Sequence, residues 1–325
     1  MNRFGTTRRL ALLLLLALPA LQAAAQTAYP SKPVRFLVGY QPGGGTDLTA
    51  RLVGERLAVA FGQPVLVENR PGASSNIAAE MVVKSAPDGH TLFISAAAMS
   101  TNPSLYRNMS FDPVKDFAPV IWLALLPNVA VVNADFPPRN IQELVAYAKA
   151  NPEKVSCASA SMGSTGHLSC EYLNMQAGTK ILHVPFKGSA GAIAAVIGGQ
   201  VPLLFDQIPA TLPHIKSGRL RAIALTAARR NANLPEVPTS DESGLPGFHA
   251  NAWVAVFAPK DTPAAIVARL NADMNRILQA ADLQQKFLDM GMEAMGGPPE
   301  RLSQMLASDT AKWAGVIKAA NITMQ

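Results

Sequence analysis

The chain has few of the residues from which metal centres and redox sites are built. Its 325 residues include two cysteines, Cys157 and Cys170, and five histidines that are scattered without the spacing of metal ligands. We therefore expect neither a metal nor another cofactor. The two cysteines can form a disulfide or can simply be small buried side chains, because their separation in sequence does not establish the close Cα approach that a bridge requires.

Long apolar runs are scarce too. The apolar run from Leu10 to Leu18 is shorter than the roughly 20 residues that span a bilayer. Arg3, Arg8 and Arg9 precede it and Ala23-Ala24-Ala25 follows it, which predicts a secretory signal over residues 1–25, cleaved after Ala25. The pair Arg8-Arg9 also allows export by the twin-arginine route. We therefore expect the mature protein in the periplasm.

Charge is low as well, at 15% charged residues. Removal of residues 1–25 takes away three arginines and no acidic residue, so the net charge falls from +6 to +3. The remaining basic residues form no block, and nucleic acid is not an expected partner. The mature chain, about 300 residues, exceeds what one hydrophobic core usually serves, which predicts two domains.

One stretch near the start predicts a site for an anion. Val34–Val38 is typical of a buried strand, Gly43-Gly44-Gly45 forms a turn, and apolar residues at helical spacing predict a helix that ends at Phe61-Gly62. Glycines let the backbone approach a guest closely, and the N–H groups of a first helical turn have no partner in the helix. Asp47, in that first turn, either orders a water beside the guest or satisfies its own backbone.

The middle of the chain repeats this arrangement. The strand Val155–Ser159 is followed by a loop of serines and glycines and a helix from about Thr165, with Ser164 or Thr165 as its cap. The loop either binds an anion or only caps the helix. Asp206, at the end of the strand Val201–Asp206, is the second acidic candidate. In doubly wound sheets ligands bind beyond the carboxyl ends of the strands, so both loops are expected at one cleft.

The order of elements predicts two lobes joined by two crossings. Three strands alternate with helices at the start, which favours a parallel sheet. A short helix is expected to start at Asn102-Pro103, with the proline in its first position. The apolar stretches 118–133 and 252–257 then bracket the middle block. We therefore expect one lobe from residues 26–127 and 252–325, the other from 128–251, and a hinge near Pro127-Asn128 and Asn251-Ala252.

Two enzyme interpretations fail on missing parts. The run Gly43-Gly44-Gly45-Thr46-Asp47-Leu48 resembles a dinucleotide fingerprint, with Glu68 where a ribose-binding acid would lie, but Leu48 occupies the position of the third small residue. The run Gly163-Ser164-Thr165-Gly166 is not a nucleophile elbow. We therefore expect no catalytic residues and no enzyme.

Many short motifs, in order along nearly the whole mature chain, resemble one family. The sequence is similar to the Bug-type extracytoplasmic solute receptors of tripartite tricarboxylate transporters. The motifs that carry this resemblance are Tyr29-Pro30-Ser31-Lys32-Pro33, Pro42-Gly43-Gly44-Gly45-Thr46-Asp47, Glu68-Asn69-Arg70-Pro71-Gly72-Ala73, Pro87-Asp88-Gly89, Asp112 to Val120, Gly166-His167-Leu168, Val184-Pro185-Phe186-Lys187-Gly188, Leu234 to Thr239 and Trp313. Departures are Ser74-Ser75 in place of a glycine pair, Phe186 in place of tyrosine, and Met162 in the second loop.

The resemblance implies a fold and a function. It implies an α/β, type II periplasmic binding protein, each lobe a mainly parallel sheet flanked by helices, that acts as a monomer. It would close on a small organic acid or acidic amino acid and deliver it to a membrane permease; presentation to a signalling partner is the alternative. The matching ligand-binding positions are Tyr40, Gly43, Gly44, Asp47, Ser161, Ser164, Thr165 and Asp206. The identity of the solute stays open.

Overall fold

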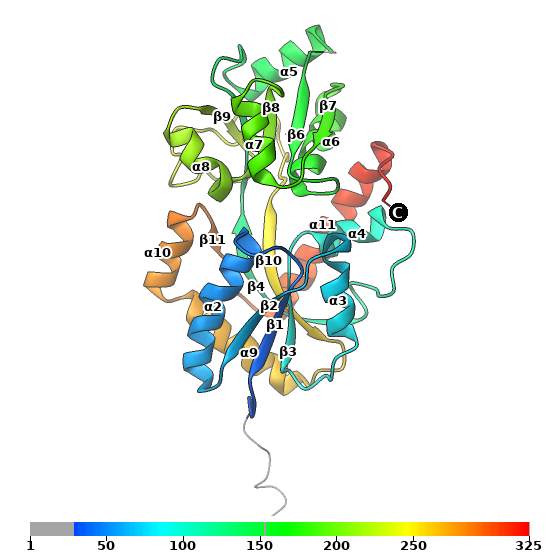
Figure 1. Cartoon of the computed structure of the whole chain (residues 1–325), viewed down its shortest axis with the longest axis vertical. Coiled ribbons are helices and arrows are strands. Elements are labelled where there is room, and N and C mark those ends of the chain that lie inside the picture. Colours follow the sequence, from blue (N-terminus) through cyan, green and yellow to red (C-terminus); the bar gives the residue numbers. More distant parts are fainter. Residues whose placement is uncertain (1–28, 153, 325) are drawn as a thin grey trace, which may run out of the picture.

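The computed structural model describes residues 29–152 and 154–324, which form two lobes, each built on one sheet (Figure 1). The predicted signal, residues 1–25, lies outside the described residues. Lobe 1 is the part built on the sheet of order β11-β4-β10-β3-β1-β2, and lobe 2 is the part built on the sheet of order β7-β6-β8-β5-β9. The two-lobed α/β class expected from the sequence is confirmed.

The elements of lobe 1 come from both ends of the chain. Its strands are β1 (Val34–Val38), β2 (Val65–Asn69), β3 (Thr91–Ser95), β4 (Phe117–Leu126), β10 (Ala252–Pro259) and β11 (Glu293–Ala294). Its helices are α2 (Gly45–Phe61), the 3₁₀ turn η2 (Ala73–Ser75), α3 (Asn76–Val83), α4 (Ala98–Leu105), α9 (Ala264–Leu278), α10 (Ala281–Asp289) and α11 (Pro299–Ala319).

The elements of lobe 2 are contiguous in sequence. Its strands are β5 (Asn128–Asn133), β6 (Ser156–Ser159), β7 (Leu182–Pro185), β8 (Leu203–Gln207) and β9 (Leu220–Leu225). Its helices are α5 (Ile141–Ala150), α6 (Thr165–Ala177), α7 (Ser189–Ile197) and α8 (Ile208–Lys216). Within the described part of the chain, no helix is both long and apolar enough to cross a membrane.

Both sheets are mixed, whereas mainly parallel sheets were expected. β1 pairs in parallel with β2 and β3, and β6 pairs in parallel with β7 and β8. β10 is antiparallel to β3 and β4, and β5 is antiparallel to β8 and β9. The reason is the crossings: β5 and β10 each enter a lobe from the inter-lobe boundary, so they run opposite to the strands whose carboxyl ends face that boundary.

This topology brings the two expected loops to the inter-lobe boundary. β4 leads through Pro127 directly into β5, so the carboxyl end of β4 faces lobe 2. β1, β2 and β3 run in the same direction as β4, because β10 is antiparallel to both β4 and β3. The loops after β1, β2 and β3 therefore face the loops after β6, β7 and β8 across the boundary (Figure 1).

Hydrogen bonds tie the two crossing segments to each other. Asn128 Nδ2 donates to Ala250 O at 2.8 Å, and Thr226 N–H donates to Asn128 O at 3.0 Å. Ala250 N–H donates in turn to Thr226 O at 3.1 Å. The residues that join the lobes thus form a short, connected strip of backbone, which holds the two crossings side by side.

Strands buried on both faces account for the apolar composition. Along β10, alternate residues point to opposite faces of the sheet, as the period of two requires. Val254 and Val256 join the core under α2 and α9, while Trp253 and Phe257 join the core on the opposite face, with α3 and α11. Burial on both faces explains why these strands appear in the sequence as continuous apolar runs.

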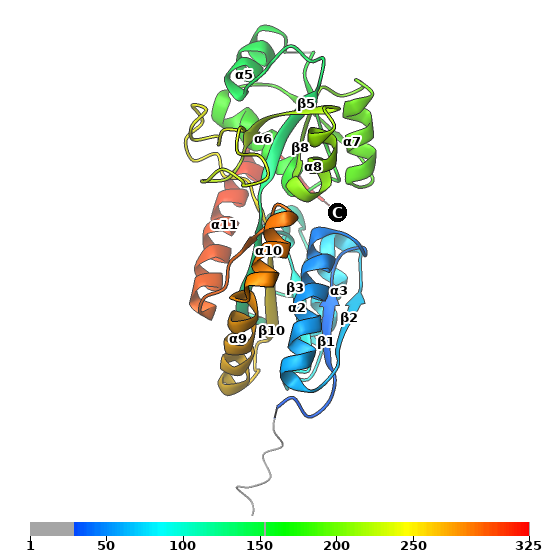
Figure 2. The same ribbon diagram turned by 90° about the vertical axis from the view of Figure 1, so that its left-hand side faces the viewer.

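One further apolar cluster joins the lobes. We call it the flank cluster; its buried members are Leu105, Leu168, Ala250, Trp313, Val316 and Ile317. Helix α11 supplies three of these side chains and runs along one side of the molecule from lobe 1 to lobe 2 (Figure 2). The last turns of α11 therefore pack against α4 of lobe 1 and α6 of lobe 2 at once.

Two helix starts differ from those expected. α4 begins at Ala98, four residues before Asn102, and Pro103 lies inside its last turn. Asn102 is held in the helix because its amide donates to Ser74 O and to Asn76 Oδ1, at 2.8 and 2.7 Å. In the sequence, Thr262-Pro263 predicts a cap followed by proline at the first position of a helix; in the structure the Thr262 hydroxyl donates to Pro259 O, and the cap position of α9 falls on Pro263.

Of the two alternatives for the cysteines, the structure has the disulfide. Cys157 in β6 and Cys170 in α6 are bonded, with their Cα atoms 6.3 Å apart. Both residues are fully buried. The bridge therefore ties the strand to the helix on either side of the second predicted anion loop.

Candidate functional site

The loop between β1 and α2 presents free backbone donors at the boundary. Gly44 is the N-cap of α2 and supplies no side-chain cap, and the first helical bond runs from Leu48 N–H to Gly44 O at 2.9 Å. The N–H groups of Gly45, Thr46 and Asp47 therefore have no carbonyl within the helix to bind. Gly43 has φ +85°, a conformation that favours glycine, and both Gly43 and Gly44 are exposed.

Asp47 is built into this loop. It is 2% exposed, and its carboxylate accepts Gly43 N–H at 2.9 Å, Asn69 Nδ2 at 2.9 Å and two bonds from Arg51 at 2.9 and 3.0 Å. Burial alone would raise the pKa of Asp47, but the hydrogen bonds from Arg51, Gly43 and Asn69 outweigh it and hold that pKa below its ordinary value. The geometry corresponds to the self-capping alternative, in which Asp47 shapes the loop.

We expect Asp47→Asn to weaken the loop and any binding that depends on it. An amide offers one acceptor where the carboxylate offers two, so donors of Gly43, Arg51 or Asn69 lose partners, at a cost of about 1–3 kcal/mol of unfolding free energy. Because the folded-state pKa is lowered, the stability from Asp47 is present above about pH 3.9 and is lost as pH falls through the lower folded value. Chemical denaturation at pH 7 and pH 3 measures both effects.

Asp282→Asn is the matched control. Asp282, in α10, pairs with Arg56, which lies in α2 as Asp47 does, but Asp282 is exposed, and exposed ion pairs contribute little to stability. If Asp47→Asn lowered the unfolding free energy at pH 7 as little as Asp282→Asn does, the hydrogen bonds around Asp47 would not stabilise the loop.

The loop between β6 and α6 is closed by its own polar groups. Ser164 is the N-cap of α6: its hydroxyl oxygen accepts His167 N–H at 3.3 Å, and its hydroxyl donates to Ser161 O at 2.8 Å. Gly163 N–H donates to His167 Nδ1 at 3.0 Å. The N–H groups of Thr165 and Gly166, in the first turn of α6, are left without helical partners.

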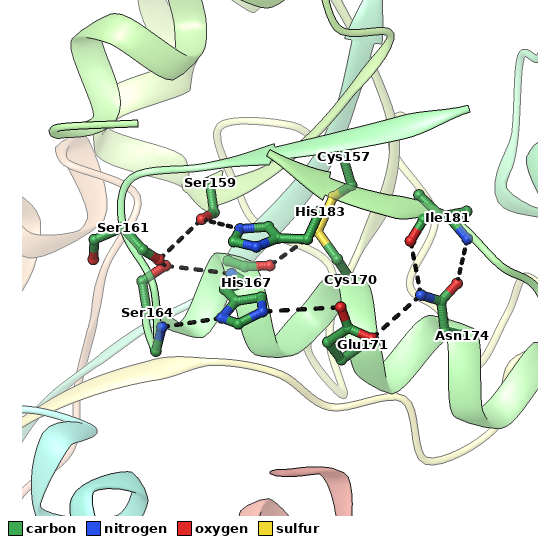
Figure 3. Close-up of polar contacts among 12 residues, drawn as sticks. Cys157, Ser159, Ser161, Ser164, His167, Cys170, Glu171, Asn174, Ile181 and His183 are labelled. Atoms are coloured by element: carbon green, nitrogen blue, oxygen red, sulfur yellow. Dashed lines mark hydrogen bonds and ion pairs between the residues drawn. A yellow bond between two sulfur atoms is a disulfide. The ribbon is translucent and has the colours of Figure 1, made fainter. Parts of the chain in front are cut away.

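Two stacked histidines lie behind this loop. The rings of His167 and His183 are 3.7 Å apart between centroids and inclined by 17° (Figure 3). Burial lowers the pKa of His167 to about 3 and that of His183 to about 4, so both are neutral near pH 7. His183 Nε2 lies 2.7 Å from Ser159 Oγ, but Ser159 is fully buried and offers no nucleophile to solvent. The pair therefore supports the loop, and no local pattern in the sequence indicates it.

Asp206 lies at the end of β8 with one oxygen free. Asp206 is 7% exposed; Oδ1 accepts Gln207 N–H at 2.8 Å, while Oδ2 is buried without a hydrogen-bond partner among the described residues. Burial raises its pKa above the ordinary carboxyl value, although the Ser189 hydroxyl, which approaches the carboxylate without meeting hydrogen-bond geometry at Oδ2, and Gln207 N–H act in the opposite direction. A buried polar atom without a partner is costly, so this oxygen marks a place where another group can bind.

Gly166 brings the start of α6 onto β8. A Cβ atom added at Gly166 would lie 2.3 Å from the carbonyl oxygen of Phe205, next to Asp206 in sequence. Only glycine allows this approach of helix to strand. The free N–H groups of α6 and the free oxygen of Asp206 therefore belong to the same edge of lobe 2.

The two loops lie where the lobes meet. A Cβ added at Gly45 would lie 3.1 Å from Gln207 Oε1 in lobe 2, so the start of α2 faces the end of β8. A Cβ added at Gly163 would lie 2.8 Å from Leu105 Cδ1 in lobe 1. The structure thus brings the first loop close to the strand end that carries Asp206, and brings the second loop against α4.

A third loop, which the sequence marked only as unusual, also reaches this boundary. After β2, Ala73, Ser74 and Ser75 have φ values of 45°, 50° and 77°, a conformation that glycine prefers. Gly72 precedes these three residues. Tyr106 helps to hold them in this conformation, because its hydroxyl donates to Ser74 Oγ at 3.1 Å. Strained backbone of this kind collects at functional sites. The serines at glycine-like positions were the only available signal.

Tyr40 lies between the first and third loops. It is half-buried, its carbonyl accepts Asn69 Nδ2 at 3.0 Å, and burial raises the pKa of its hydroxyl. Gly39 before it must be glycine, because a Cβ there would lie 1.6 Å from Ser75 Oγ. Within residues 29–152 and 154–324, no group of three potential metal ligands comes together.

Comparison with known proteins identifies the family. Residues 49–322 match the family model described as tripartite tricarboxylate transporter family receptor. The chain belongs to this receptor family. The receptor is 36% identical to Protein BugT of Bordetella pertussis over 89% of its own length and 90% of BugT. The resemblance to Bug-type receptors is thereby confirmed.

Solved structures agree with this assignment. The receptor superposes with a TM-score of 0.83 and 36% identity on Rpa4515 of R. palustris with adipate, over 91% of this chain and all of that one. On the periplasmic binding protein BugD it superposes with a TM-score of 0.78 and 35% identity, over 91% of this chain and all of BugD. On MatC of Rhodopseudomonas palustris with bound malate it superposes with a TM-score of 0.78 and 34% identity, over 89% of this chain and all of MatC. The receptor is thus of the periplasmic solute-binding type.

Proposed function

We propose that the receptor captures a small carboxylated solute between its lobes and delivers it to the membrane permease of a tripartite tricarboxylate transporter. The solute is an organic acid or an acidic amino acid, the protein is an exported monomer, and it catalyses no reaction. The residues proposed to bind are Tyr40, Gly43, Gly44, Asp47, Ser161, Ser164, Thr165 and Asp206. The adipate of Rpa4515 and the malate of MatC, both dicarboxylates, support a carboxylated solute.

The observation that carries the proposal is that two helix N-termini, one from each lobe, face the inter-lobe boundary. The free N–H groups at the starts of α2 and α6 favour negative charge through both hydrogen bonding and the helix dipoles. Arg51 is already paired with Asp47, so the helix ends rather than this arginine are left to bind a carboxylate. Asp206 Oδ2, buried without a hydrogen-bond partner among the described residues, can accept a hydrogen from a hydroxyl or amino group of the same guest or hold a bridging water.

A thermal-shift screen of organic acids, acidic amino acids, sugars and cationic amino acids tests the proposal. We expect carboxylates to raise the melting temperature, because a ligand at 100 times its Kd stabilises by about 2.7 kcal/mol. Response to sugars or cationic amino acids, with none to carboxylates, would contradict it. Turnover of a hydrolysable or nicotinamide substrate by the same preparation would contradict the non-enzymatic role.

We further propose that the lobes, residues 26–127 with 252–325 and residues 128–251, move about the crossings when the solute binds. Each loop offers donors from one side only, so a guest that contacts both favours the closed form. Small-angle scattering with and without the solute found in the screen measures the change: a smaller radius of gyration supports closure.

A further inference from the structure

Tyr106, which directly follows α4, holds the third loop, Ala73–Ser75, by its hydroxyl. That hydroxyl donates to Ser74 Oγ at 3.1 Å, and the amide of Asn102, in the last turn of α4, donates to Ser74 O at 2.8 Å. Ser74 has φ 50°, a conformation that a residue other than glycine keeps only where its surroundings hold it. The two hydrogen bonds from the end of α4 therefore keep the third loop in its strained shape.

The third loop in turn packs on the start of the first loop. A Cβ added at Gly39 would lie 1.6 Å from Ser75 Oγ and 2.5 Å from Ser75 Cβ, so the Ser75 side chain fills the space beside Gly39. Gly39 directly precedes Tyr40, one of the residues proposed to bind the solute. A shift of the third loop would therefore also move the start of the first loop.

The neighbours of Tyr106 also contact the second loop, in lobe 2. A Cβ added at Gly163 would lie 2.8 Å from Leu105 Cδ1 and 3.2 Å from Met324 Sδ, so both side chains lie against that loop. Met324 N–H donates to Leu105 O at 2.8 Å, and Met324 pairs with Tyr106 in an isolated parallel β-bridge. Tyr106 is thus part of a continuous series of contacts that runs from the first loop of lobe 1 to the second loop of lobe 2.

We propose that Tyr106 is a positioning residue for solute binding, which sets the first and second loops relative to each other through these contacts. The inference rests on the proposed function, because it needs a solute that contacts both loops. Without the Tyr106 hydroxyl, the third loop relaxes from its strained conformation in the free protein. Only a fraction of the molecules then present the first loop in its binding shape, and the apparent affinity falls in proportion to that fraction.

Tyr106→Phe removes the hydroxyl and keeps the ring against the flank cluster. Calorimetric titration with adipate and malate, or with another carboxylate of the screen if neither binds, should give an affinity about threefold to tenfold below that of the wild type, the effect of one hydrogen bond. Tyr172→Phe is the matched control, because Tyr172 also packs against the flank cluster and its hydroxyl donates to Gly247 O at 3.0 Å. We expect this variant to bind like the wild type. A purely structural role would lower the stability of both variants and the affinity of neither, so unchanged affinity of Tyr106→Phe, or equal losses of affinity in the two variants, would overturn the inference.

Ser74→Gly tests whether Tyr106 acts through the third loop. Glycine adopts a φ of 50° without strain, and it offers the Tyr106 hydroxyl no side-chain partner. In the Ser74→Gly background we therefore expect Tyr106→Phe to change the affinity less than about twofold, so that the two changes are not additive. An equal loss of affinity in both backgrounds would mean that Tyr106 acts by another route and would overturn the inference. If the wild type itself binds no carboxylate of the screen, the proposed function is wrong, and the inference that rests on it is wrong too.

Discussion

Replacing Cys157 and Cys170 together by alanine should lower the unfolding free energy by about 3 kcal/mol, the value for a closed loop of roughly 15 residues. The bridge spans a sequence separation of 13 and closes the second predicted anion loop, so its loss frees that loop in the unfolded chain. Since the bridge also pins β6 to α6, the variant should bind its solute more weakly. Urea denaturation and calorimetric titration of the two proteins measure these effects.

Reduction provides an independent comparison. Wild type unfolded and refolded under reducing conditions should have the same unfolding free energy as the double variant, whereas the variant itself should not respond to reductant. A double variant as stable as the oxidised wild type would mean that the packing of Leu173 and Phe205 around the site of the bridge is sufficient to hold α6 on its own.

The second large effect is expected from Gly166→Ala. The added methyl group would lie 2.3 Å from the carbonyl oxygen of Phe205, a backbone atom that cannot turn aside, so the start of α6 must move away from β8. Overpacking of this kind costs about 1–3 kcal/mol. Because the move separates the free N–H groups of α6 from Asp206, we expect affinity for the solute to fall at least about tenfold, equivalent to 1.4 kcal/mol. Denaturation and titration are again the measurements.

Gly315→Ala separates this clash from a general effect of the substitution. Gly315 lies inside α11, and a Cβ there meets no atom within 4 Å. Alanine is favoured over glycine in a helix by about 1 kcal/mol, so this variant should be as stable as the wild type or more so, with unchanged affinity. Comparable losses in both variants would contradict a specific role for Gly166.

Local signals predicted much of the fold because the chain marks its elements clearly. The end of α2 at Phe61 follows from Gly62, which has φ 62° and closes the helix. No local pattern indicates α8, because it contains Pro209 and Pro213, residues that usually indicate a turn. α4 was placed too late because Pro103 is typical of a helix start, while the alanines before it carry no cap signal.

The two loops of the candidate site stand out in the sequence, whereas the hydrogen-bond network around them does not. Gly43, Ser164 and Asp206 stand out in the sequence because of residue type and position after a strand. The contact of His183 with Ser159 and the bond between Cys157 and Cys170 depend on neighbours far along the chain, and no local pattern reports them. Likewise, the sequence placed an acid at the end of β8, but only the structure shows that one of its oxygens is left without a partner.

The flank cluster makes the connection between the lobes asymmetric, because it lies on one side of the molecule. Trp313, Val316 and Ile317 fasten one margin of lobe 1 to lobe 2, and Met324 N–H adds a bond to Leu105 O at 2.8 Å beside them. Separating the lobes on this side of the molecule would have to break the packing of the flank cluster. The lobes can therefore separate more easily on the side away from α11, and a solute would enter and leave there rather than past Trp313.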